Sequence, residues 1–204
     1  LQAVVSLCVK YGVPLICDEI HADFVYQPAK HRCILSFEGA KDVAVMLCAA
    51  SKTFNVAGLQ QSSIVCLNPE VLEKLKREMD AAGVRSGNAF ALAATRAAYT
   101  SCDEWLDGLK DYLAENRDYT VDFIEKHMPK IRVTPLDATY LMWLDCRELG
   151  LEQPELMERI LAQHVKVNDG LFFGEMGRGF IRLNIACPRA QLQSALERLA
   201  AALA

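Results

Sequence analysis

Two charged residues, each placed directly after an apolar run, are the part of the sequence best suited to chemistry. Asp18 follows the run over 13–17, and Lys52 follows the run over 42–50 with only Ser51 between. A lysine amine can form an imine with a carbonyl group and afterwards act as a base. A carboxylate can hold a nearby cation and keep its proton in place. The pair would therefore suit covalent chemistry on a small carbonyl compound.

Short apolar runs predict the strands that must position these two residues. The runs over 13–17, 42–50 and 62–67 are bounded by turns, which is typical of strands buried on both faces. Because helix or loop separates them, they predict a mostly parallel sheet covered on both sides. Ligands bind beyond the carboxyl ends of the strands in such sheets. We therefore expect Asp18 and Lys52 to share one ligand-binding edge.

The rest of the chain predicts more helices, among them a long one, and then a smaller lobe. Charged residues with an apolar stripe at helical spacing predict one helix over 103–127, whose length suits a bridge between two lobes. After Pro129, short strands and helices alternate, which indicates a small α+β domain. The other elements expected are helices over 1–11, 69–82, 89–100, 154–163 and 188–203 and strands over 131–134, 140–145, 165–168 and 179–186.

Composition and charge exclude several classes of partner. The chain is 52% hydrophobic and 24% charged with a formal net charge of -4, which is typical of an ordinary soluble α/β protein. That charge argues against nucleic acid and anionic membrane surfaces as partners, and no apolar run is long enough to span a bilayer. The eight cysteines form no CxxC pair, so we expect no metal site. Several lie in apolar runs, which favours reduced thiols in a cytoplasmic protein.

Three blocks of sequence around the candidate residues resemble a known family. The segment over 51–59, S-K-T-F-N-V-A-G-L, and the segment over 18–21, D-E-I-H, resemble the cofactor signatures of the aminotransferase class I/II family. The segment over 179–186, G-F-I-R-L-N-I-A, resembles the strand that carries this family's substrate-binding arginine. The resemblance covers essentially the whole chain. It implies an enzyme that depends on pyridoxal 5'-phosphate (PLP).

The resemblance also implies a role for each of five residues. Lys52 would carry the cofactor covalently and serve as the catalytic base, and Asp18 would keep the cofactor's ring nitrogen protonated. His21 stands where transaminases of the family usually carry a tyrosine that donates to the ring oxygen, and Ser51 would help to hold the phosphate. Arg182 would bind the α-carboxylate of an amino-acid substrate, because its planar fork matches a carboxylate.

Within this family, several sequence blocks of the chain resemble the cystathionine β-lyase type of C–S lyase more than a transaminase. The blocks D-E-I-H-A-D-F-V-Y, Y-L-M-W-L-D-C and G-F-I-R-L-N-I-A-C-P-R carry this likeness, and Gln60 stands where transaminases tend to carry an arginine. The implied reaction is α,β-elimination on a sulfur amino acid such as cystathionine or cysteine, which gives a thiol, pyruvate and ammonia. The alternatives are a class I/II aminotransferase and a non-catalytic fragment or binding module.

The same resemblance implies the organisation of the chain. It predicts an α/β fold, the C-terminal part of a mostly parallel three-layer large domain followed by a small α+β domain. The expected regions are part of the large cofactor-binding domain over 1–102, a bridging helix over 103–128 and the small C-terminal domain over 129–204. Because family proteins are about twice this length and commonly dimeric, we expect a C-terminal fragment, inactive alone, of a homodimer. In the family, the segment with Arg85, Ser86 and Asn88 approaches the neighbouring subunit's cofactor.

Overall fold

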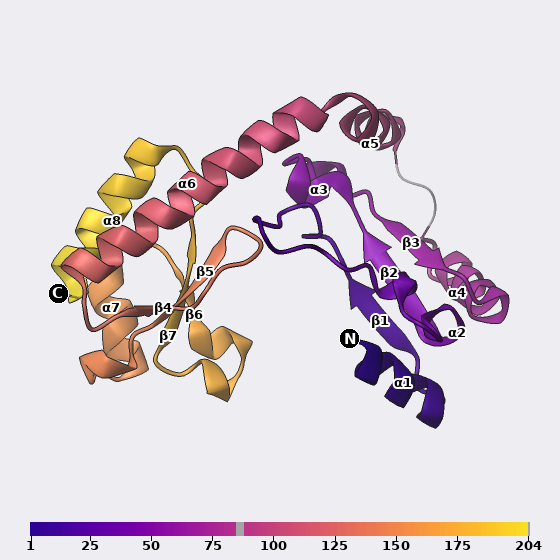
Figure 1. Ribbon diagram of the computed structural model, residues 1–204, viewed down its shortest axis with the longest axis horizontal. Coiled ribbons are helices and arrows are strands. Elements are labelled where there is room, and N and C mark those ends of the chain that lie inside the picture. Colours follow the sequence, from indigo (N-terminus) through magenta and orange to yellow (C-terminus); the bar gives the residue numbers. More distant parts are fainter. Residues whose placement is uncertain (85–87, 204) are drawn as a thin grey trace. The chain divides into compact units, whose positions relative to one another are not determined.

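The chain forms two compact units in the computed structural model, which describes residues 1–84 and 88–203 (Figure 1). Unit 1 comprises Leu1–Asp107 and unit 2 comprises Gly108–Ala204. This division falls inside one long helix, α6 (Asp103–His127), which begins and ends where the sequence predicts. The predicted domain limits at 102 and 128 remain a prediction. Arg85 and Ser86 lie outside the described residues.

Unit 1 contains a three-stranded sheet in the order β1–β2–β3. Strand β1 (Leu15–Asp18) runs parallel to β2 (Ala44–Cys48), and their register places Asp18 beside Leu47. Two neighbouring parallel strands end at the same edge of a sheet. The carboxyl ends of β1 and β2, which precede the two candidate residues, therefore lie side by side.

The third strand departs from the predicted parallel arrangement. Strand β3 (Ser63–Cys66) runs antiparallel to β2, with Ser63 opposite Cys48. The connection before it contains one turn of α-helix, α3 (Ala50–Thr53), and the 3-10 turn η2 (Ala57–Leu59). A parallel connection usually needs a longer helix that crosses the face of the sheet. This connection instead reverses the chain beside β2. The strand predicted over 42–50 is also shorter than expected, because its first residues belong to α2 (Ala40–Val43).

The helices of unit 1 begin and end at residues suited to those positions. Helix α1 (Gln2–Tyr11) ends at Gly12, whose φ of 64° is left-handed and accessible to glycine without strain. Helix α4 (Pro69–Ala81) begins after Asn68, whose side chain accepts hydrogen bonds from two backbone amides of the first turn. Helix α5 (Ala89–Ser101) follows. These three predicted helices are confirmed.

The core of unit 1 lies on one face of its sheet. Its buried residues come from α1, η1 (Ile34–Ser36), α2 and the start of β2, and are Val5, Ile34, Ala40 and Ala44. The opposite face is partly open, since Ile16 in the middle of β1 is 70% exposed. The prediction that these strands are buried on both faces is therefore wrong for β1.

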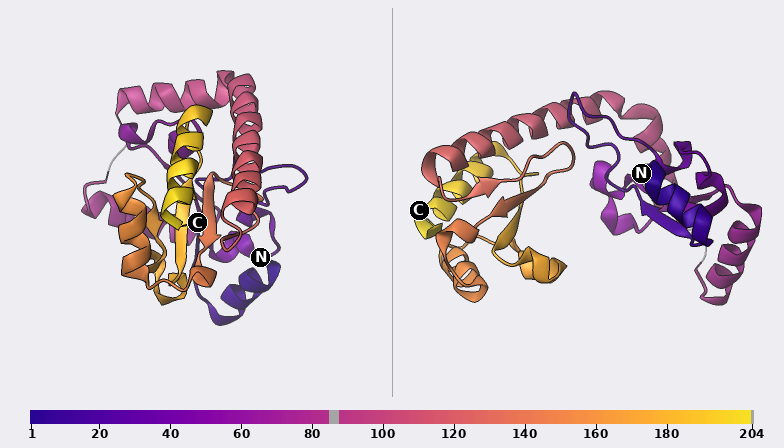
Figure 2. Two further views of the ribbon diagram at one scale, coloured as in Figure 1. Left: turned by 90° about the vertical axis from the view of Figure 1, so that its left-hand side faces the viewer. Right: turned by 60° about the horizontal axis from the view of Figure 1, so that its bottom comes forward.

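Unit 2 contains a four-stranded antiparallel sheet in the order β4–β5–β7–β6. The strands are β4 (Arg132–Val133), β5 (Leu141–Asp145), β6 (Asn168–Asp169) and β7 (Phe180–Asn184). The helices α6, α7 (Gln153–Ala162) and α8 (Arg189–Leu203) pack together on one face of this sheet (Figures 1 and 2). The predicted α+β lobe is confirmed, although β6 begins later than the run over 165–168 indicates.

The two faces of this second sheet differ in character. Along β5 and β7, alternate side chains such as Met142 and Ile181 are fully buried against the helices, as expected from the two-residue period of a strand. The side chains between them are half-buried on the other face, and they include Trp143 and Arg182. Trp143 thus lies on the face that the helices do not cover.

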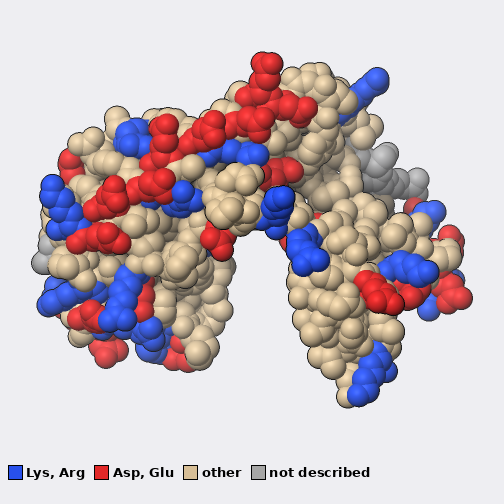
Figure 3. Space-filling model, viewed as in Figure 1, with Lys and Arg blue, Asp and Glu red and all other residues tan. Residues whose placement is uncertain are grey.

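Acidic side chains follow one another along α6 on the face seen in Figure 3. Among the described residues, no helix is both long enough and apolar enough to cross a membrane.

Candidate functional site

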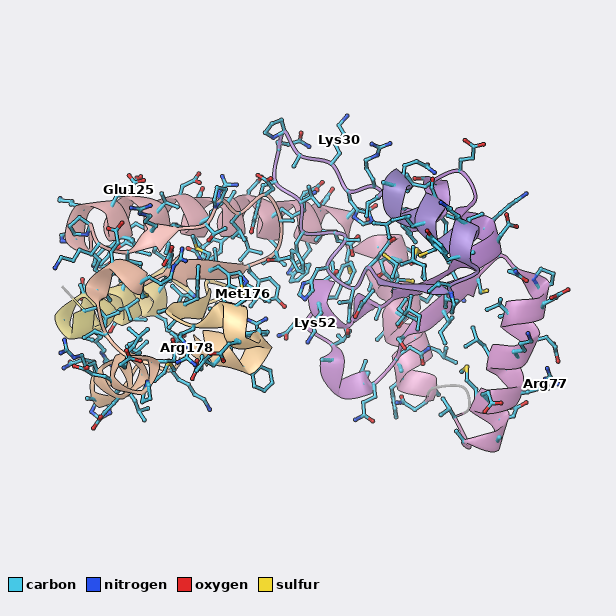
Figure 4. The ribbon with its side chains drawn as sticks, turned by 90° about the horizontal axis from the view of Figure 1, so that it is seen from below. Lys30, Lys52, Arg77, Glu125, Met176 and Arg178 are labelled. Carbon is cyan, nitrogen blue, oxygen red and sulfur yellow. The ribbon has the colours of Figure 1, made fainter. Side chains whose placement is uncertain are left out.

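Lys52 lies in the short helix α3, directly beyond the carboxyl end of β2. Its side chain is exposed and extends away from the ribbon (Figure 4). Within the described part of the chain, its amine forms no ion pair or hydrogen bond. The helix is held by its own backbone, because the amides of Phe54 and Val56 donate to the carbonyls of Ala50 and Ser51. The lysine is therefore presented on a fixed turn with its amine accessible.

Asp18 is the last residue of β1, the strand paired with β2. Its side chain is exposed, and one carboxylate oxygen accepts a hydrogen bond of 3.0 Å from the backbone amide of Ile20. Because the other oxygen is available at the surface, the carboxylate can still hold a cation or a protonated nitrogen. Asp18 and Lys52 thus lie at the same edge of one sheet, as the sequence predicts.

Glu19, the neighbour of Asp18, is engaged within the protein instead. Its carboxylate accepts a 2.7 Å hydrogen bond from the backbone amide of Ile34 and lies 2.8 Å from Nε2 of His31. Burial alone would raise the pKa of Glu19, but these two hydrogen bonds, together with the charge of His31 and a hydrogen bond from the Cys17 thiol, lower the pKa below its ordinary value. Of the two adjacent acids, Asp18 is therefore the one accessible to a ligand.

His21 and Ser51, the two other predicted cofactor contacts, also belong to unit 1. His21 lies in the turn after β1, half-buried, with its ring 6.2 Å from that of Phe24. Ser51 is half-buried in α3 beside Lys52. Four of the five predicted residues therefore come from the end of β1 and from the segments that follow β1 and β2.

A hydrogen bond that the sequence did not reveal joins these two segments. The hydroxyl of Thr53 donates to the carboxylate of Asp23 over 2.7 Å, and Thr53 is 1% exposed. Asp23 also lies near Tyr99, whose pKa is raised first by burial and then by the negative charge of Asp23. Phe54 packs edge-on against the same Tyr99, with 5.5 Å between ring centroids. The segment after Asp18 and the helix of Lys52 are thus tied by a hydrogen bond between the buried Thr53 and the half-buried Asp23.

Arg182 lies on β7 in unit 2, half-buried on the face that the helices leave uncovered. Its Nη2 donates to the side-chain oxygen of Asn168 over 3.1 Å, and its guanidinium lies 4.4 Å from the ring centroid of Phe173. Its Nε is buried and has no hydrogen-bond partner among the described residues. Burial raises the pKa of Tyr140, and the nearby charge of Arg182 partly offsets this. Such an arginine can bind an oxygen anion by donating hydrogen bonds to it.

The loop that carries Phe173 is closed by two glycines in contact. It consists of the 3-10 turns η4 (Gly170–Phe173) and η5 (Glu175–Gly177). A Cβ at Gly170 would lie 2.1 Å from the carbonyl oxygen of Gly177, and one at Gly177 would lie 2.0 Å from that of Gly170. Neither position can hold a side chain unless the backbone moves.

A hollow in unit 1 is lined by none of the predicted residues. It has a volume of about 800 Å³ and lies between β3 and α4, with Ile64, Leu72 and Met79 in its wall. Its lining includes Lys76 and Asp80 but neither Asp18 nor Lys52. The hollow is therefore separate from the edge that carries the predicted residues.

Comparison with known proteins identifies the family. The model of the family described as aminotransferase class I and II matches residues 1–199. The chain belongs to this family. The aminotransferase class I/II match covers both units, so the segments of Asp18, Lys52 and Arg182 all lie within it.

Curated relatives of the chain include a cystathionine beta-lyase. The chain is 38% identical over 200 residues to the cystathionine beta-lyase PatB of Bacillus subtilis and 33% identical over 201 residues to the protein MalY of Escherichia coli. These alignments cover 97% and 98% of this chain but 52% and 51% of the relatives. The chain therefore spans about half the length of the curated relatives that it matches.

Solved structures of the class I/II fold agree with the architecture. A PLP-bound putative aminotransferase from Clostridium difficile matches with a TM-score of 0.97 and 34% identity, over 100% of this chain and 53% of that one. Cystalysin from Treponema denticola, which contains PLP, matches with a TM-score of 0.95 and 32% identity, over 99% of this chain and 52% of that one. The predicted fold class is confirmed, as the C-terminal half of the PLP-dependent aminotransferase fold.

Proposed function

We propose that this chain supplies the lysine, the acid and the arginine of a PLP-dependent C–S β-lyase. In the complete protein, a sulfur amino acid such as cystathionine or cysteine would give a thiol, pyruvate and ammonia. The observation that carries the proposal is the pairing of β1 with β2, which puts Asp18 and Lys52 at one sheet edge with both side chains accessible. The likeness to cystathionine beta-lyases gives it further support.

The residues at this edge fit PLP by the chemistry of their side chains. PLP, when bound, supplies an electron sink that stabilises negative charge at the substrate's α-carbon. Lys52 has an accessible amine that can hold the aldehyde carbon and, once released, take the α-proton. Asp18 has an accessible carboxylate oxygen that can keep a pyridine nitrogen protonated. His21 and Ser51 would hold the ring oxygen and the phosphate.

Arg182 would anchor the substrate by its α-carboxylate. Its guanidinium is fixed by Asn168 and Phe173, and its buried Nε has no acceptor among the residues described. A buried donor without a partner costs about 1–3 kcal/mol, so this arrangement favours the arrival of an oxygen anion. Orientation of the substrate would follow from the two parallel hydrogen bonds that an arginine can give to a carboxylate.

The proposal extends to the organisation of the protein. The chain would be the C-terminal part of a cytoplasmic homodimer of about its relatives' length, and by itself it would be inactive. Its regions would be part of the cofactor-binding domain over 1–102, the bridging helix over 103–128 and the small domain over 129–204. Size-exclusion chromatography with light scattering tests the dimer, and cell fractionation tests the location.

The decisive experiment is substitution of the lysine in the complete protein. Borohydride reduction of the PLP-loaded protein should fix the cofactor to the peptide that contains Lys52, as read by mass spectrometry. Lys52→Ala should abolish this attachment and lower the rate of elimination about 1,000-fold or more. Lys41→Ala, a change of an exposed lysine in the same unit, is the matched control and should leave both unchanged. Activity retained by Lys52→Ala would refute the proposal.

A class I/II aminotransferase is the second candidate. It is favoured by the match to a putative aminotransferase with 34% identity over the whole chain. The products separate the two, because a lyase releases thiol and pyruvate from one substrate, whereas an aminotransferase needs a keto-acid acceptor. If neither reaction occurs and borohydride traps nothing on Lys52, the protein is a non-catalytic binding module.

A further inference from the structure

We propose that Phe173 is the positioning residue of the carboxylate clamp, and that its ring sets the orientation of the Arg182 guanidinium and keeps water from one face of it. This inference rests on the proposed function, since it takes Arg182 as the group that meets the substrate's carboxylate. It lies wholly within unit 2.

The ring of Phe173 is placed for a cation–π contact. The guanidinium carbon of Arg182 lies 4.4 Å from the ring centroid, well within the distance of about 6 Å over which such contacts act. Trp143 supports the ring from the side, edge-on at 5.2 Å between centroids. Trp143 and Arg182 are also direct cross-strand neighbours in the β5–β7 pair. The phenyl ring, the indole and the cation therefore form one packed group.

Two contacts of Arg182 matter for the approach of a ligand. Its guanidinium carbon lies over the ring of Phe173, and Asn168 accepts a hydrogen bond from Nη2. A carboxylate binds a guanidinium in its plane and along an edge, so a ring on the face does not compete with it. Removing water from that face lowers the local dielectric constant and strengthens attraction to the incoming anion. Phe173 would thus promote capture of the carboxylate without touching it.

The adjacent residue provides a natural comparison. Phe172 and Phe173 belong to the same 3-10 turn and touch edge-on, with 5.2 Å between ring centroids. Phe172 is 83% exposed, whereas Phe173 is 42% exposed because the guanidinium and Trp143 cover part of its ring. The two phenylalanines share a residue type and a turn, but Phe173 is the one seated on the cation.

Steady-state kinetics of the complete protein test the inference. Phe173→Leu removes the π face but keeps an apolar side chain, and it should raise KM for the amino-acid substrate about 10-fold while kcat stays within about two-fold. Phe173→Tyr keeps the aromatic ring, so its KM should stay close to that of the wild type. Phe172→Leu is the matched control and should change neither constant. If Phe173→Leu does not fold, Phe173→Met gives the same comparison.

A binding measurement on the 204-residue chain gives a second readout that needs neither cofactor nor turnover. Propionate carries a carboxylate and no amine, so it reports on the clamp alone. Its titration can be followed through the indole N–H signal of Trp143, while Trp105 in unit 1 serves as the internal reference. Phe173→Leu should weaken propionate binding about 10-fold, and Phe172→Leu should not.

The outcomes separate this inference from the proposed function. If wild-type protein eliminates thiol but Phe173→Leu behaves like wild type in KM and in propionate affinity, the inference fails and the proposed function stands. If Lys52 carries no cofactor, the proposed function fails, and the titration still tells whether Phe173 governs the clamp. An equal loss in Phe172→Leu and Phe173→Leu would show that the turn matters only for packing, which would also overturn the inference.

Discussion

The two units hold their candidate residues in different ways. In unit 1, Asp18 and Lys52 project from turns whose contacts are made mostly by the backbone, and both side chains are exposed. In unit 2, Arg182 is half-buried and its guanidinium already meets Asn168 and Phe173. The difference indicates that the acid and the amine depend on a ligand for their partners, whereas the clamp is preorganised by the protein.

The core of unit 2 is also more extensively buried than the core of unit 1. In unit 2, helices α6, α7 and α8 bury one face of a four-stranded sheet. In unit 1, the core lies on one side, and Leu7, Val13, Ile16 and Leu67 remain half or more exposed. Stability should therefore be concentrated in unit 2, and the following changes test this contrast.

The largest effect is expected in the core of unit 2. The Leu144 side chain is fully buried, so Leu144→Ala would leave a cavity in its place, at a cost of about 3 kcal/mol in the free energy of unfolding. Ile16→Ala in β1 should cost less than about 0.5 kcal/mol, because Ile16 is 70% exposed. Urea denaturation of both variants checks the comparison. Equal losses would mean that the open face of β1 is covered in solution.

A smaller effect separates the two adjacent acids of unit 1. Glu19→Gln would disrupt the carboxylate that meets Ile34 and His31, and should cost about 2 kcal/mol of stability. Asp18→Asn should leave stability within about 0.5 kcal/mol and instead weaken PLP binding in the complete protein. Thermal unfolding and cofactor titration measure the two effects. A stability loss from Asp18→Asn as large as that from Glu19→Gln would contradict the division of roles.

The pH dependence of stability follows from Glu19. Its pKa is lower in the folded protein than the ordinary value of 4.5, so its contribution is fully present above that pH. As pH falls through the lowered pKa, the folded protein must take up a proton and the contribution is lost. Unfolding measured from pH 6 to pH 3 should therefore show a steeper acid loss in wild type than in Glu19→Gln. Parallel curves would rule this carboxylate out as the source.

Loss of the hydrogen bond between helix α3 and the turn that holds Asp23 should have a modest effect. Thr53→Val removes the hydroxyl that donates to Asp23 and should cost about 1 kcal/mol of stability. Thr53→Ser keeps the hydroxyl donor and should therefore cost less stability than Thr53→Val. Its remaining cost would come from the loss of one buried methyl group. Chemical denaturation of the two variants gives the measurement. A loss in Thr53→Ser that matches Thr53→Val would assign the effect to packing.

Thiol labelling gives the mildest test of the contrast in burial. Burial raises the pKa of Cys146 in the core of unit 2 to about 12, so little thiolate forms at pH 8. Cys8 on α1 is only half-buried. In the native protein, iodoacetamide should therefore label Cys8 before Cys146. In urea it should label both cysteines. Peptide mass spectrometry follows the labelling. Early labelling of Cys146 would show that the core of unit 2 opens readily.

Local patterns in the sequence predicted the residues that end strands and begin helices. Asp18 and Lys52 were found because an apolar run that stops at a charge is a local signal. The helix predicted over 69–82 was found because its apolar residues recur at helical spacing. The direction of β3 was predicted wrongly, because a sequence pattern indicates a strand but not the orientation of the strand beside it. The exposure of Ile16 also escaped prediction, since an apolar run looks the same whether or not a layer covers it.

The surroundings of Arg182 depend on contacts between distant segments. Arg182 itself was found through its strand, but its contacts with Asn168 and Phe173 follow from the β6–β7 register and from the loop that ends that hairpin. The position of Trp143 on the open face required the same register. The bond between Thr53 and Asp23 likewise joins two loops whose residue types alone are unremarkable in a turn.

The touching pair Gly170 and Gly177 sets what variation this region can tolerate. Between them, the tip is free to change, since Met176 is 93% exposed and Phe172 nearly as much (Figure 4 labels Met176). A single methyl group at either glycine would instead push the backbones of the two 3-10 turns apart. That movement would separate Phe173 from the guanidinium of Arg182. Descendants of this protein could therefore diversify the rim of the loop while its two ends stay the same.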